Sequence, residues 1–320
     1  MSSWKKKALE LMVSTELSWR QIAKEVGKPK STISDYLRKF KNNPEHLQSV
    51  EVKENAPKIL LYDLETSLLK SYHCGLWNQN ISIGAIIEDW YVICWSAKWL
   101  GTDTMINSSV HTEGRMGYER TRDNEAAVIL KLWKLVDEAD ILIAYNGKKF
   151  DRKKMNAKFL EYELPEPSPY KVIDPMLIVK GNFALTSNKM DFVTKYIDSN
   201  DAGKLTTNLQ LWIDAMNDDT IALDRMQEYC DEDINVLERV YMAVRHWDKN
   251  APNLALHYDD NTPRCNSCAS TDLRPIPNKT HNTGLSRFSI VRCGNCQKIL
   301  RDRVNLLSKE KRDSLLMNAG

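Results

Sequence analysis

Residues 58–66 read KILLYDLET, and this stretch decides the fold. Its first five residues form a short, mostly apolar run, which predicts a strand buried in a sheet. Asp63 and Glu65 follow at the end of that strand. Because strand side chains alternate between the two faces, these carboxylates share one face, about 6 to 7 Å apart. Two acids at the open end of a buried strand are therefore candidates for a functional site.

Two later stretches place further acidic residues in comparable positions. Residues 141–145 read ILIAY and predict a second strand, after which Asn146 begins the sequence NGKKFD. Asp151 then stands at the start of a helix beside the same end of the sheet. Tyr229 and Asp233 are one helical turn apart on one face of a long helix. Each motif is common when it occurs singly.

Strands and helices alternate around these motifs. Apolar patterning predicts strands over 81–100 and 104–111 and helices over 123–135, 150–160 and 223–247. In the last helix the apolar residues recur at helical spacings, and they are Met226, Tyr229, Val236, Val240 and Val244. This order of elements predicts an α/β domain with a central mixed sheet flanked by helices.

Taken together, the segments DLE, NGKKFD and YCDED resemble the three exonuclease motifs of the DEDD superfamily, in its tyrosine-bearing branch. The N-x-x-x-F-D and Y-C-x-x-D forms are most similar to the proofreading domain of B-family DNA polymerases. The resemblance covers residues 58–248 and implies an RNase H-like fold with 3′–5′ exonuclease activity. The catalytic residues that it implies are Asp63, Glu65, Asp151, Tyr229 and Asp233. The substrate contacts that it implies are Thr66, Asn146 and Phe150.

Electrostatics independently indicates that a cluster of four carboxylates needs cations. Unit charges about 4 Å apart repel by about 4 kcal/mol at an effective dielectric of about 20. Hard oxygen ligands select Mg²⁺ or Mn²⁺, and two such ions clamp the attacking and leaving oxygens of a phosphoryl displacement. By the resemblance, Asp63, Glu65 and Asp233 hold the ion that generates the nucleophilic hydroxide. Asp63 and Asp151 hold the second ion, and Tyr229 orients the attacking water, because a phenol with a pKa near 10 is a poor base.

Some residues in these motifs have a structural interpretation as well as a functional one. Asn146 is either a substrate contact or a capping amide, and Phe150 is either a substrate contact or a packed core ring. Asp231 and Glu232 lie off the helix face that carries Tyr229, so we expect both to be solvated.

The net charge of +2 hides a strong partition along the chain. Residues 1–42 contain 10 Lys or Arg and 4 Asp or Glu, and residues 262–320 contain 11 and 4. Residues 43–261 contain 24 and 35. The basic terminal segments suit modules that bind a polyanion. The acidic middle segment suits a module whose carboxylates do something other than bind that polyanion directly. Ordinary solvated surface charge is the alternative.

Residues 18–40 read SWRQIAKEVGKPKSTISDYLRKF, which predicts two short helices with Ser18 as the first cap and Gly27 at the turn. This pattern resembles the helix-turn-helix of bacterial resolvases and transposases, whose second helix enters the major groove of DNA. The DNA contacts that it implies are Lys28, Lys30, Thr32, Ser34 and Arg38. A helical hairpin used for protein contact is the alternative.

Four of the seven cysteines form two C-x-x-C pairs, and they are Cys265, Cys268, Cys293 and Cys296. In a protein without an export signal, this spacing predicts a four-thiolate zinc ribbon with one structural Zn²⁺ rather than disulfides. Zinc would supply folding energy that so small a segment lacks. The basic residues expected to face nucleic acid are Arg287, Arg292, Lys298, Arg301 and Arg303. A reactive dithiol is the alternative.

A chain of 320 residues exceeds what one ordinary core needs, so we expect separate domains. The sequence has no uncharged apolar run of about 18 residues and no apolar segment behind its N-terminal lysines, which predicts a cytoplasmic protein. The divisions that we expect are a helix-turn-helix domain over 1–42, a linker over 43–57, an RNase H-like domain over 58–248, a linker over 249–262, a zinc ribbon over 263–304 and a basic tail over 305–320.

The sequence therefore predicts a 3′–5′ exonuclease with a nucleic-acid-binding module on each side and DNA as the expected substrate. Because the three modules occupy most of the sequence, we expect any DNA polymerase to be a separate partner, served in trans by proofreading. The combination is also similar to proteins carried by bacteriophages. Two alternatives remain, namely a transposase or recombinase built on an RNase H-like core and a catalytically inert DNA-binding regulator.

Overall fold

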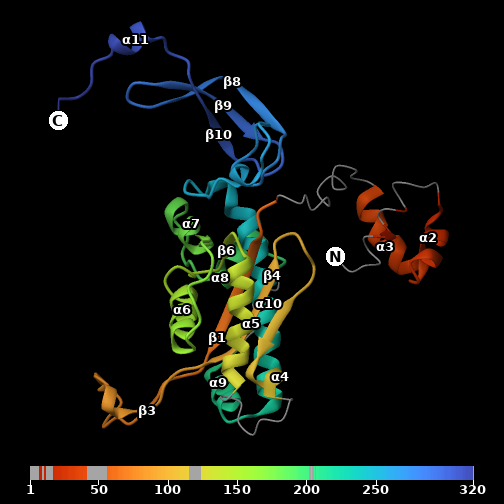
Figure 1. Cartoon of the computed structure of the whole chain (residues 1–320), viewed down its shortest axis with the longest axis vertical. Coiled ribbons are helices and arrows are strands. Elements are labelled where there is room, and N and C mark those ends of the chain that lie inside the picture. Colours follow the sequence, from red (N-terminus) through yellow and green to blue (C-terminus); the bar gives the residue numbers. More distant parts are fainter. Residues whose placement is uncertain are drawn as a thin grey trace.

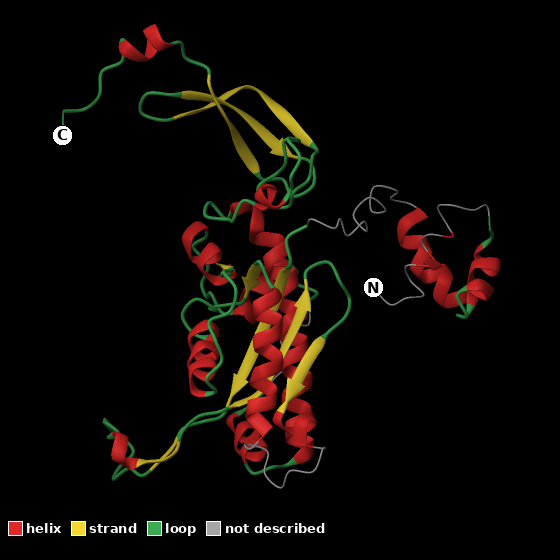
Figure 2. Cartoon of the chain, in the orientation of Figure 1, coloured by secondary structure: helices red, strands yellow, loops and turns green. Residues whose placement is uncertain are grey.

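The computed structural model describes residues 7–8, 11, 17–41, 56–114, 124–201, 203, 205 and 207–319. Its central body is a five-stranded mixed sheet with helices on both faces (Figure 1, Figure 2). The strands are β1 (Ile59–Thr66), β4 (Val92–Trp99), β5 (Ile106–Ser109), β6 (Ile141–Ile143) and β7 (Lys171–Ile173). The predicted α/β class with a central mixed sheet is confirmed.

The strand order is β5-β4-β1-β6-β7, which places β1 in the middle of the sheet. β1 runs antiparallel to β4, with Asp63 opposite Ser96, and parallel to β6, with Leu61 opposite Ile143. β6 and β7 are parallel as well. The carboxyl ends of β1, β6 and β7 therefore meet at one edge of the sheet, where the predicted site residues follow.

Helices cover the sheet in two separate cores. The helices are α4 (Val110–Gly114), α5 (Glu125–Glu138), α6 (Asp151–Glu161), α7 (Pro175–Asn182), α8 (Met190–Ile197), α9 (Leu209–Met216) and α10 (Thr220–Val244). Leu60 and Tyr62 share a core with α5 and α6, whereas Leu61 shares a core with α7, α8 and α10. The alternation of β1 side chains between these cores leaves Asp63 and Glu65 on the α10 side.

The longest helix, α10, begins at a well-formed cap. The Asp219 side chain accepts hydrogen bonds from the backbone N–H groups of Ile221 and Ala222, which satisfies two of the free donors of the first turn. All five apolar positions predicted to face inward, from Met226 to Val244, are buried. This helix therefore holds Tyr229 and Asp233 rigidly against the sheet.

The predicted strand over 81–100 is only partly right. The structure has a short helical turn, η2 (Ile83–Ala85), a short strand β3 (Ile86–Glu88), and then β4. The segment before β4 also includes β2 (Lys70–Ser71), which pairs with β3 away from the main sheet. Apolar residues here do not reach a core, since Ile83 is 88% exposed. The predicted strand over 104–111 is also shorter, because α4 begins at Val110.

The other two modules are small. α2 (Trp19–Glu25) and α3 (Lys30–Lys41) pack around Ile22, Ile33 and Leu37, and Gly27 has a φ of 66° at the turn between them. The C-terminal module is a three-stranded antiparallel sheet of β8 (Leu273–Asn282), β9 (Arg287–Cys293) and β10 (Ile299–Asn305). It follows η4 (Arg245–Trp247) and η5 (Leu254–His257), and α11 (Lys309–Asp313) comes after it. The linker predicted over 43–57 lies almost entirely outside the described residues.

Among the residues that the structure describes, no helix is both long enough and apolar enough to span a membrane.

Candidate active site

Three of the predicted carboxylates converge. Oxygen atoms of Asp63, Glu65 and Asp233 lie within 4.8 Å of one another, the first two on β1 and the third on α10. Asp233 is 1% exposed, whereas Asp63 and Glu65 are half-buried. Three carboxylates at this separation suit a hard divalent cation, since they repel one another without one. Their role as metal ligands stays a prediction.

Cys230 connects α10 to the first of these acids. Its Sγ lies 3.5 Å from the backbone oxygen of Asp63 and 3.9 Å from Asp63 Oδ2. Burial raises the pKa of the Cys230 thiol well above its usual value, with Cys94, Asp63 and Glu65 adding to the shift. The neutral thiol is therefore a hydrogen-bond donor to Asp63.

Asp231 is not simply solvated, contrary to the expectation from its helix position. Its carboxylate accepts hydrogen bonds from Ser96 Oγ at 2.5 Å, Asn107 Nδ2 at 2.9 Å and Gln227 Nε2 at 3.1 Å. Ser96 and Asn107 belong to β4 and β5, so this carboxylate ties α10 to the far half of the sheet. Helical spacing shows which face a residue is on, but not which strand lies beneath it.

Tyr229 shares the α10 face of Asp233, as the sequence predicts. It is 9% exposed, and its ring packs edge-on against Trp212 of α9, with 6.2 Å between the ring centroids. The ring is therefore held in one orientation, and its hydroxyl is positioned by the packing of α9 on α10. A catalytic role for Tyr229 stays a prediction.

Asp151 lies outside the group of three converging carboxylates. It begins α6 and is 3% exposed. Tyr62, on the opposite face of β1 from Asp63, has its pKa raised well above the usual value by burial first and then by the charge of Asp151. The Tyr62 hydroxyl is buried without a hydrogen-bond partner among the described residues. The Asp151 side chain therefore lies on the α6 side of the sheet, near Tyr62.

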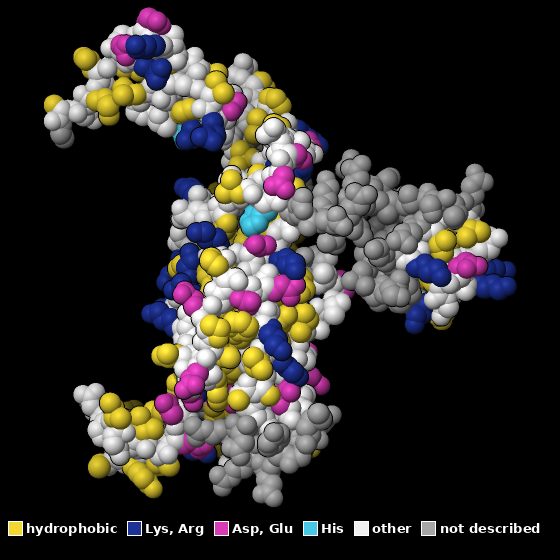
Figure 3. All heavy atoms as spheres, viewed as in Figure 1, with side chains coloured by type: hydrophobic (Ala, Val, Ile, Leu, Met, Phe, Trp, Pro, Cys, Tyr) yellow, Lys and Arg dark blue, Asp and Glu magenta, His cyan; other side chains and the backbone are white. Residues whose placement is uncertain are grey.

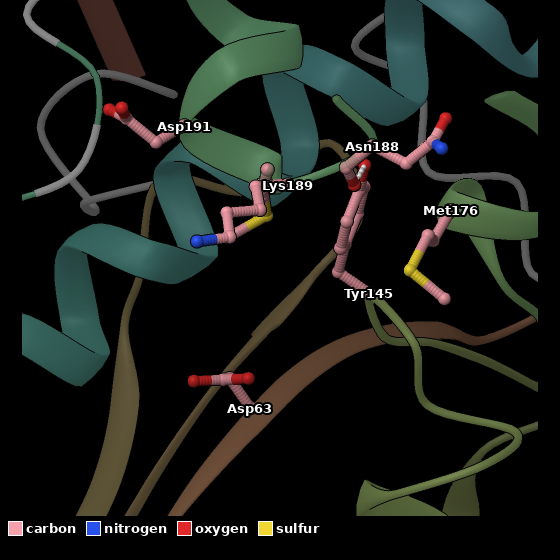
Figure 4. Close-up of a pocket in the computed structure, with 7 residues that line it drawn as sticks. Asp63, Tyr145, Met176, Asn188, Lys189 and Asp191 are labelled. Carbon is pink, nitrogen blue, oxygen red and sulfur yellow. Dashed lines mark hydrogen bonds between the residues drawn. The ribbon is translucent and has the colours of Figure 1, made fainter. Parts of the chain in front are cut away.

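A cleft of about 520 Å³ opens beside the carboxylates. Its lining consists of Asp63, Tyr145, Met176, Asn188, Lys189, Met190 and Asp191 (Figure 4). The Tyr145 hydroxyl donates a 2.7 Å hydrogen bond to the backbone oxygen of Asn188. This bond holds the segment that leads into α8. In Figure 4 the Lys189 side chain extends into the space between α8 and Asp63. Except for Asp63, sequence reasoning missed these residues.

The three predicted substrate contacts are not among the residues that line this cleft. Asn146 has a φ of 63°, and its backbone N–H donates to Asp174 Oδ1 at 2.9 Å. It shapes the turn between β6 and α6, with Asp174 as the anchor. Phe150 is 42% exposed, so it is not a packed core ring. Thr66 lies at a β-bulge opposite Val92. Substrate contact by these three residues stays a prediction.

The four cysteines of the C-x-x-C pairs also converge, with their sulfur atoms within 4.8 Å of one another. Cys265 Sγ lies 3.5 Å from Cys296 Sγ, and Cys268 Sγ lies 3.5 Å from Cys293 Sγ. Hydrogen bonds from Cys265 and then Cys268 lower the pKa of Cys296, which favours its thiolate, the form that binds a metal. A tetrahedral Zn²⁺ with sulfur ligands at about 2.3 Å requires similar spacing. The cluster therefore fits a zinc-ribbon-like module.

Lys298 is a correction to the predicted basic surface. It is 7% exposed, and its Nζ donates a 2.6 Å hydrogen bond to the backbone oxygen of Asp248, which follows η4. It therefore docks the cysteine module onto the end of the central body. The other predicted residues of this surface, Arg287, Arg292, Arg301 and Arg303, are exposed.

The predicted DNA contacts of the N-terminal module are only partly described. Lys28, Lys30 and Thr32 are exposed and Ser34 is half-buried, whereas the side chain of Arg38 lies outside the described residues. Their role on DNA stays a prediction.

A match to a protein-family model supports the fold class. Residues 100–245 match the family model of the RNase_H superfamily, a range that contains α10 but begins after β1. No curated protein matches the chain. The chain is similar to the structure of the family B DNA polymerase from the hyperthermophilic archaeon Pyrobaculum calidifontis, with 12% identity and a TM-score of 0.43. That similarity covers 59% of this chain and 25% of the polymerase chain, so this chain spans about a quarter of the polymerase's length. The central mixed sheet with helices on both faces has the RNase H-like arrangement that the match over residues 100–245 indicates.

Proposed function

We propose that the chain is a metal-dependent nuclease that removes nucleotides from the 3′ end of a nucleic acid, with DNA as the expected substrate. The observation that carries this proposal is the meeting of three carboxylates beside a cleft of about 520 Å³, with Asp63 in both. Ligand pockets commonly measure about 300–1,000 Å³, so the cleft has the size to hold a terminal nucleotide.

The carboxylates fit Mg²⁺ or Mn²⁺ by the chemistry of their donors. Asp63, Glu65 and Asp233 would hold one ion, and Asp63 and Asp151 would hold a second, as the motif resemblance implies. When bound, the ions supply stabilisation of the charge that builds on the phosphate and on its leaving oxygen. The protein's own contribution is to fix Asp63 and Glu65 on β1, Asp233 on α10 and Asp151 at the start of α6.

Lys189 is the residue best placed to bind the substrate phosphate. It is exposed, lines the cleft with Asp63, and forms no ion pair within the described part of the chain. It also occupies the N-cap position of α8, where backbone N–H groups and the helix dipole favour an anion. A phosphate between Lys189 and Asp63 would lie in this cleft. By the motif resemblance, the Tyr229 hydroxyl would orient the attacking water.

A basic stretch within the acidic central domain supports a nucleic-acid substrate. Residues 148–154 read KKFDRKK and carry five cations around Asp151. Lys148, Lys149 and Lys153 are exposed. Figure 3 shows Lys and Arg side chains gathered along the edge of the body where Figure 1 places α7 and the neighbouring end of α6. Such a row can neutralise the phosphates of a strand that leads to the site.

The flanking modules complete the proposal. Residues 1–42 would bind DNA by the second helix of a helix-turn-helix, residues 58–248 would form the exonuclease domain, and residues 263–304 would form a zinc ribbon with an arginine surface for nucleic acid. A polymerase would be a partner in trans.

The test is digestion of DNA and RNA oligonucleotides labelled at either end, by the full chain, in Mg²⁺ and in EDTA. We expect stepwise loss from the 3′ end, release of nucleoside monophosphates, and no turnover in EDTA. Asp233→Asn should abolish turnover, while Asp224→Asn, an exposed acid on the same helix, should not. Strand transfer into a plasmid would instead identify a transposase, and binding without digestion would identify an inert regulator.

A further inference from the structure

The segment of residues 68–90, here called the arm, projects from the body as a narrow two-stranded ribbon (Figure 1). Ser67 and Tyr91 close its base, with Ser67 N–H donating to Tyr91 O at 2.8 Å and Tyr91 N–H donating to Ser67 Oγ at 2.9 Å. Tyr72 N–H donates to Ala85 O, which joins the two limbs further out. An isolated two-stranded ribbon is marginally stable in water, so such an arm needs a surface to lie on.

The arm is strongly apolar and exposed. Its large exposed residues are Leu69 at 44%, Tyr72 at 74%, Leu76 at 83%, Trp77 at 82%, Ile81 at 46%, Ile83 at 88% and Ile87 at 54%. Hydrophobic side chains are prominent on its visible face in Figure 3. Monomeric proteins rarely expose an apolar patch above about 300–600 Å². Seven such side chains approach roughly 800 Å², which is one partner's share of a standard interface.

The charge of this end of the molecule selects a protein partner over nucleic acid. Residues 71–87 contain no Asp, Glu, Lys or Arg, so the outer arm offers nothing to neutralise phosphates. The base of the arm contacts α9, where Leu68 N–H lies 3.3 Å from Met216 Sδ. Acids surround that helix, among them Asp214, Asp218 and Asp219. An uncharged arm can lie against such a surface, whereas a phosphate backbone is repelled.

A suitable apolar surface exists on the same chain. Leu209 and Ile213 stand one turn apart on α9 and are 63% and 37% exposed. Beyond its base the arm leads away from the body in Figure 1, so its outer part does not cover α9 of its own chain. A two-fold interface can be built from two different patches on each subunit, here an arm and a receiving helix. The arm of each copy then contacts the receiving helix of the other copy, which gives two equivalent contacts.

We infer that the chain forms a two-fold homodimer in which the arm of each copy packs on α9 of the other. This inference does not depend on the nuclease assignment. Leu76 and Trp77 would be the apolar anchors, since they are the large side chains nearest the tip, and Leu209 and Ile213 would receive them.

The test is the molar mass of the full, zinc-loaded chain by light scattering across a range of concentrations. We expect twice the mass of one chain for the wild type, and the single-chain mass for the double variants Leu76→Ser/Trp77→Ser and Leu209→Ser/Ile213→Ser. Leu160→Ser removes an 82% exposed leucine from α6 and should leave the dimer intact. Unchanged melting temperatures would show that the variants fold.

A second readout uses Cys74, an exposed cysteine on the arm. Its rate of reaction with an uncharged maleimide should fall severalfold as the protein concentration rises through the dimer range. A single-chain mass for the wild type at every concentration would overturn the inference. So would a dimer that survives the arm variant, or one that depends on the arm but not on α9. If the wild type is monomeric and the arm variant no longer binds oligonucleotides, the arm would be reassigned to nucleic-acid binding.

Discussion

The thiol of Cys230 lies 3.9 Å from the Asp63 carboxylate and 3.5 Å from the Asp63 backbone oxygen, which joins α10 to β1 at the centre of the candidate site. The contact links the element that carries Asp233 to the element that carries Asp63 and Glu65. The separation of these carboxylates therefore depends on a buried hydrogen bond as well as on packing.

Replacing Cys230 should change metal binding more than stability. In Cys230→Val the donor to Asp63 is lost at similar volume, and we expect the Mg²⁺ concentration for half-maximal activity to rise about 10-fold, as for other residues that orient metal ligands. Cys230→Ser keeps a donor and should retain most of the Mg²⁺ affinity. Cys94→Ser, in the neighbouring buried thiol, is the control. A Val variant that melts earlier but binds Mg²⁺ normally would limit Cys230 to packing.

Lys189→Ala should weaken the substrate complex. With the cation at the start of α8 removed, kcat/KM should fall about 10-fold, equal to about 1.4 kcal/mol. The salt dependence of binding should also become shallower, because one phosphate contact is lost. Steady-state digestion at several salt concentrations measures both effects. Lys180→Ala, on the exposed surface of α7, should leave them unchanged, and an equal effect of both substitutions would remove Lys189 from the site.

Asp151→Asn tests the acid that the structure leaves outside the converging group. If Asp151 holds the second ion, turnover should fall by about 100-fold or more, because several kcal/mol of transition-state stabilisation are lost. Mn²⁺ binding at Asp63, Glu65 and Asp233 should persist, which calorimetry can measure. Full activity of Asp151→Asn would reduce the site to three carboxylates.

Removal of zinc should unfold the C-terminal sheet and spare the central body. A chelator would free four thiols for alkylation and abolish hydrogen-exchange protection in β8–β10, because the small module depends on its metal. Protection of β1 and α10 should be retained.

Gly294→Ala is a milder test of the same module. An added Cβ at Gly294 would lie 1.8 Å from Asp272 Oδ2, so the exposed Asp272 side chain must turn away and weaken its ion pair with Arg274. We expect a loss of less than about 1 kcal/mol in the stability of the module, because an exposed side chain can move and a surface ion pair contributes little. Equal protection of the module with and without zinc would contradict a structural metal site.

Elements were predictable from the sequence where an apolar pattern repeats over many residues, or where an apolar run ends in charged residues. β1 and α10 were predicted because KILLY is an apolar run that ends in acids and because α10 keeps its spacing over 25 residues. Helices α7, α8 and α9 have only eight residues each, too few for a clear period, so the cleft residues Asn188 and Lys189 were missed.

Two further errors share a physical cause. The apolar residues at 81–87 favour a strand of the sheet, since a sequence pattern does not distinguish a core from a surface that awaits a partner. Lys298 was read as surface for nucleic acid, although it bonds to Asp248 O in the structure. In both cases, tertiary contacts decide what local composition leaves open.

The most direct test of the central claim is calorimetric titration of Mn²⁺ into the full, zinc-loaded chain, compared with the Asp63→Asn/Asp233→Asn double variant. Saturable binding by the wild type, weakened at least about 10-fold in the variant, is the expected result, because carboxylates are the ligands of this ion. Equal binding by the two proteins would show that these acids do not form a metal centre.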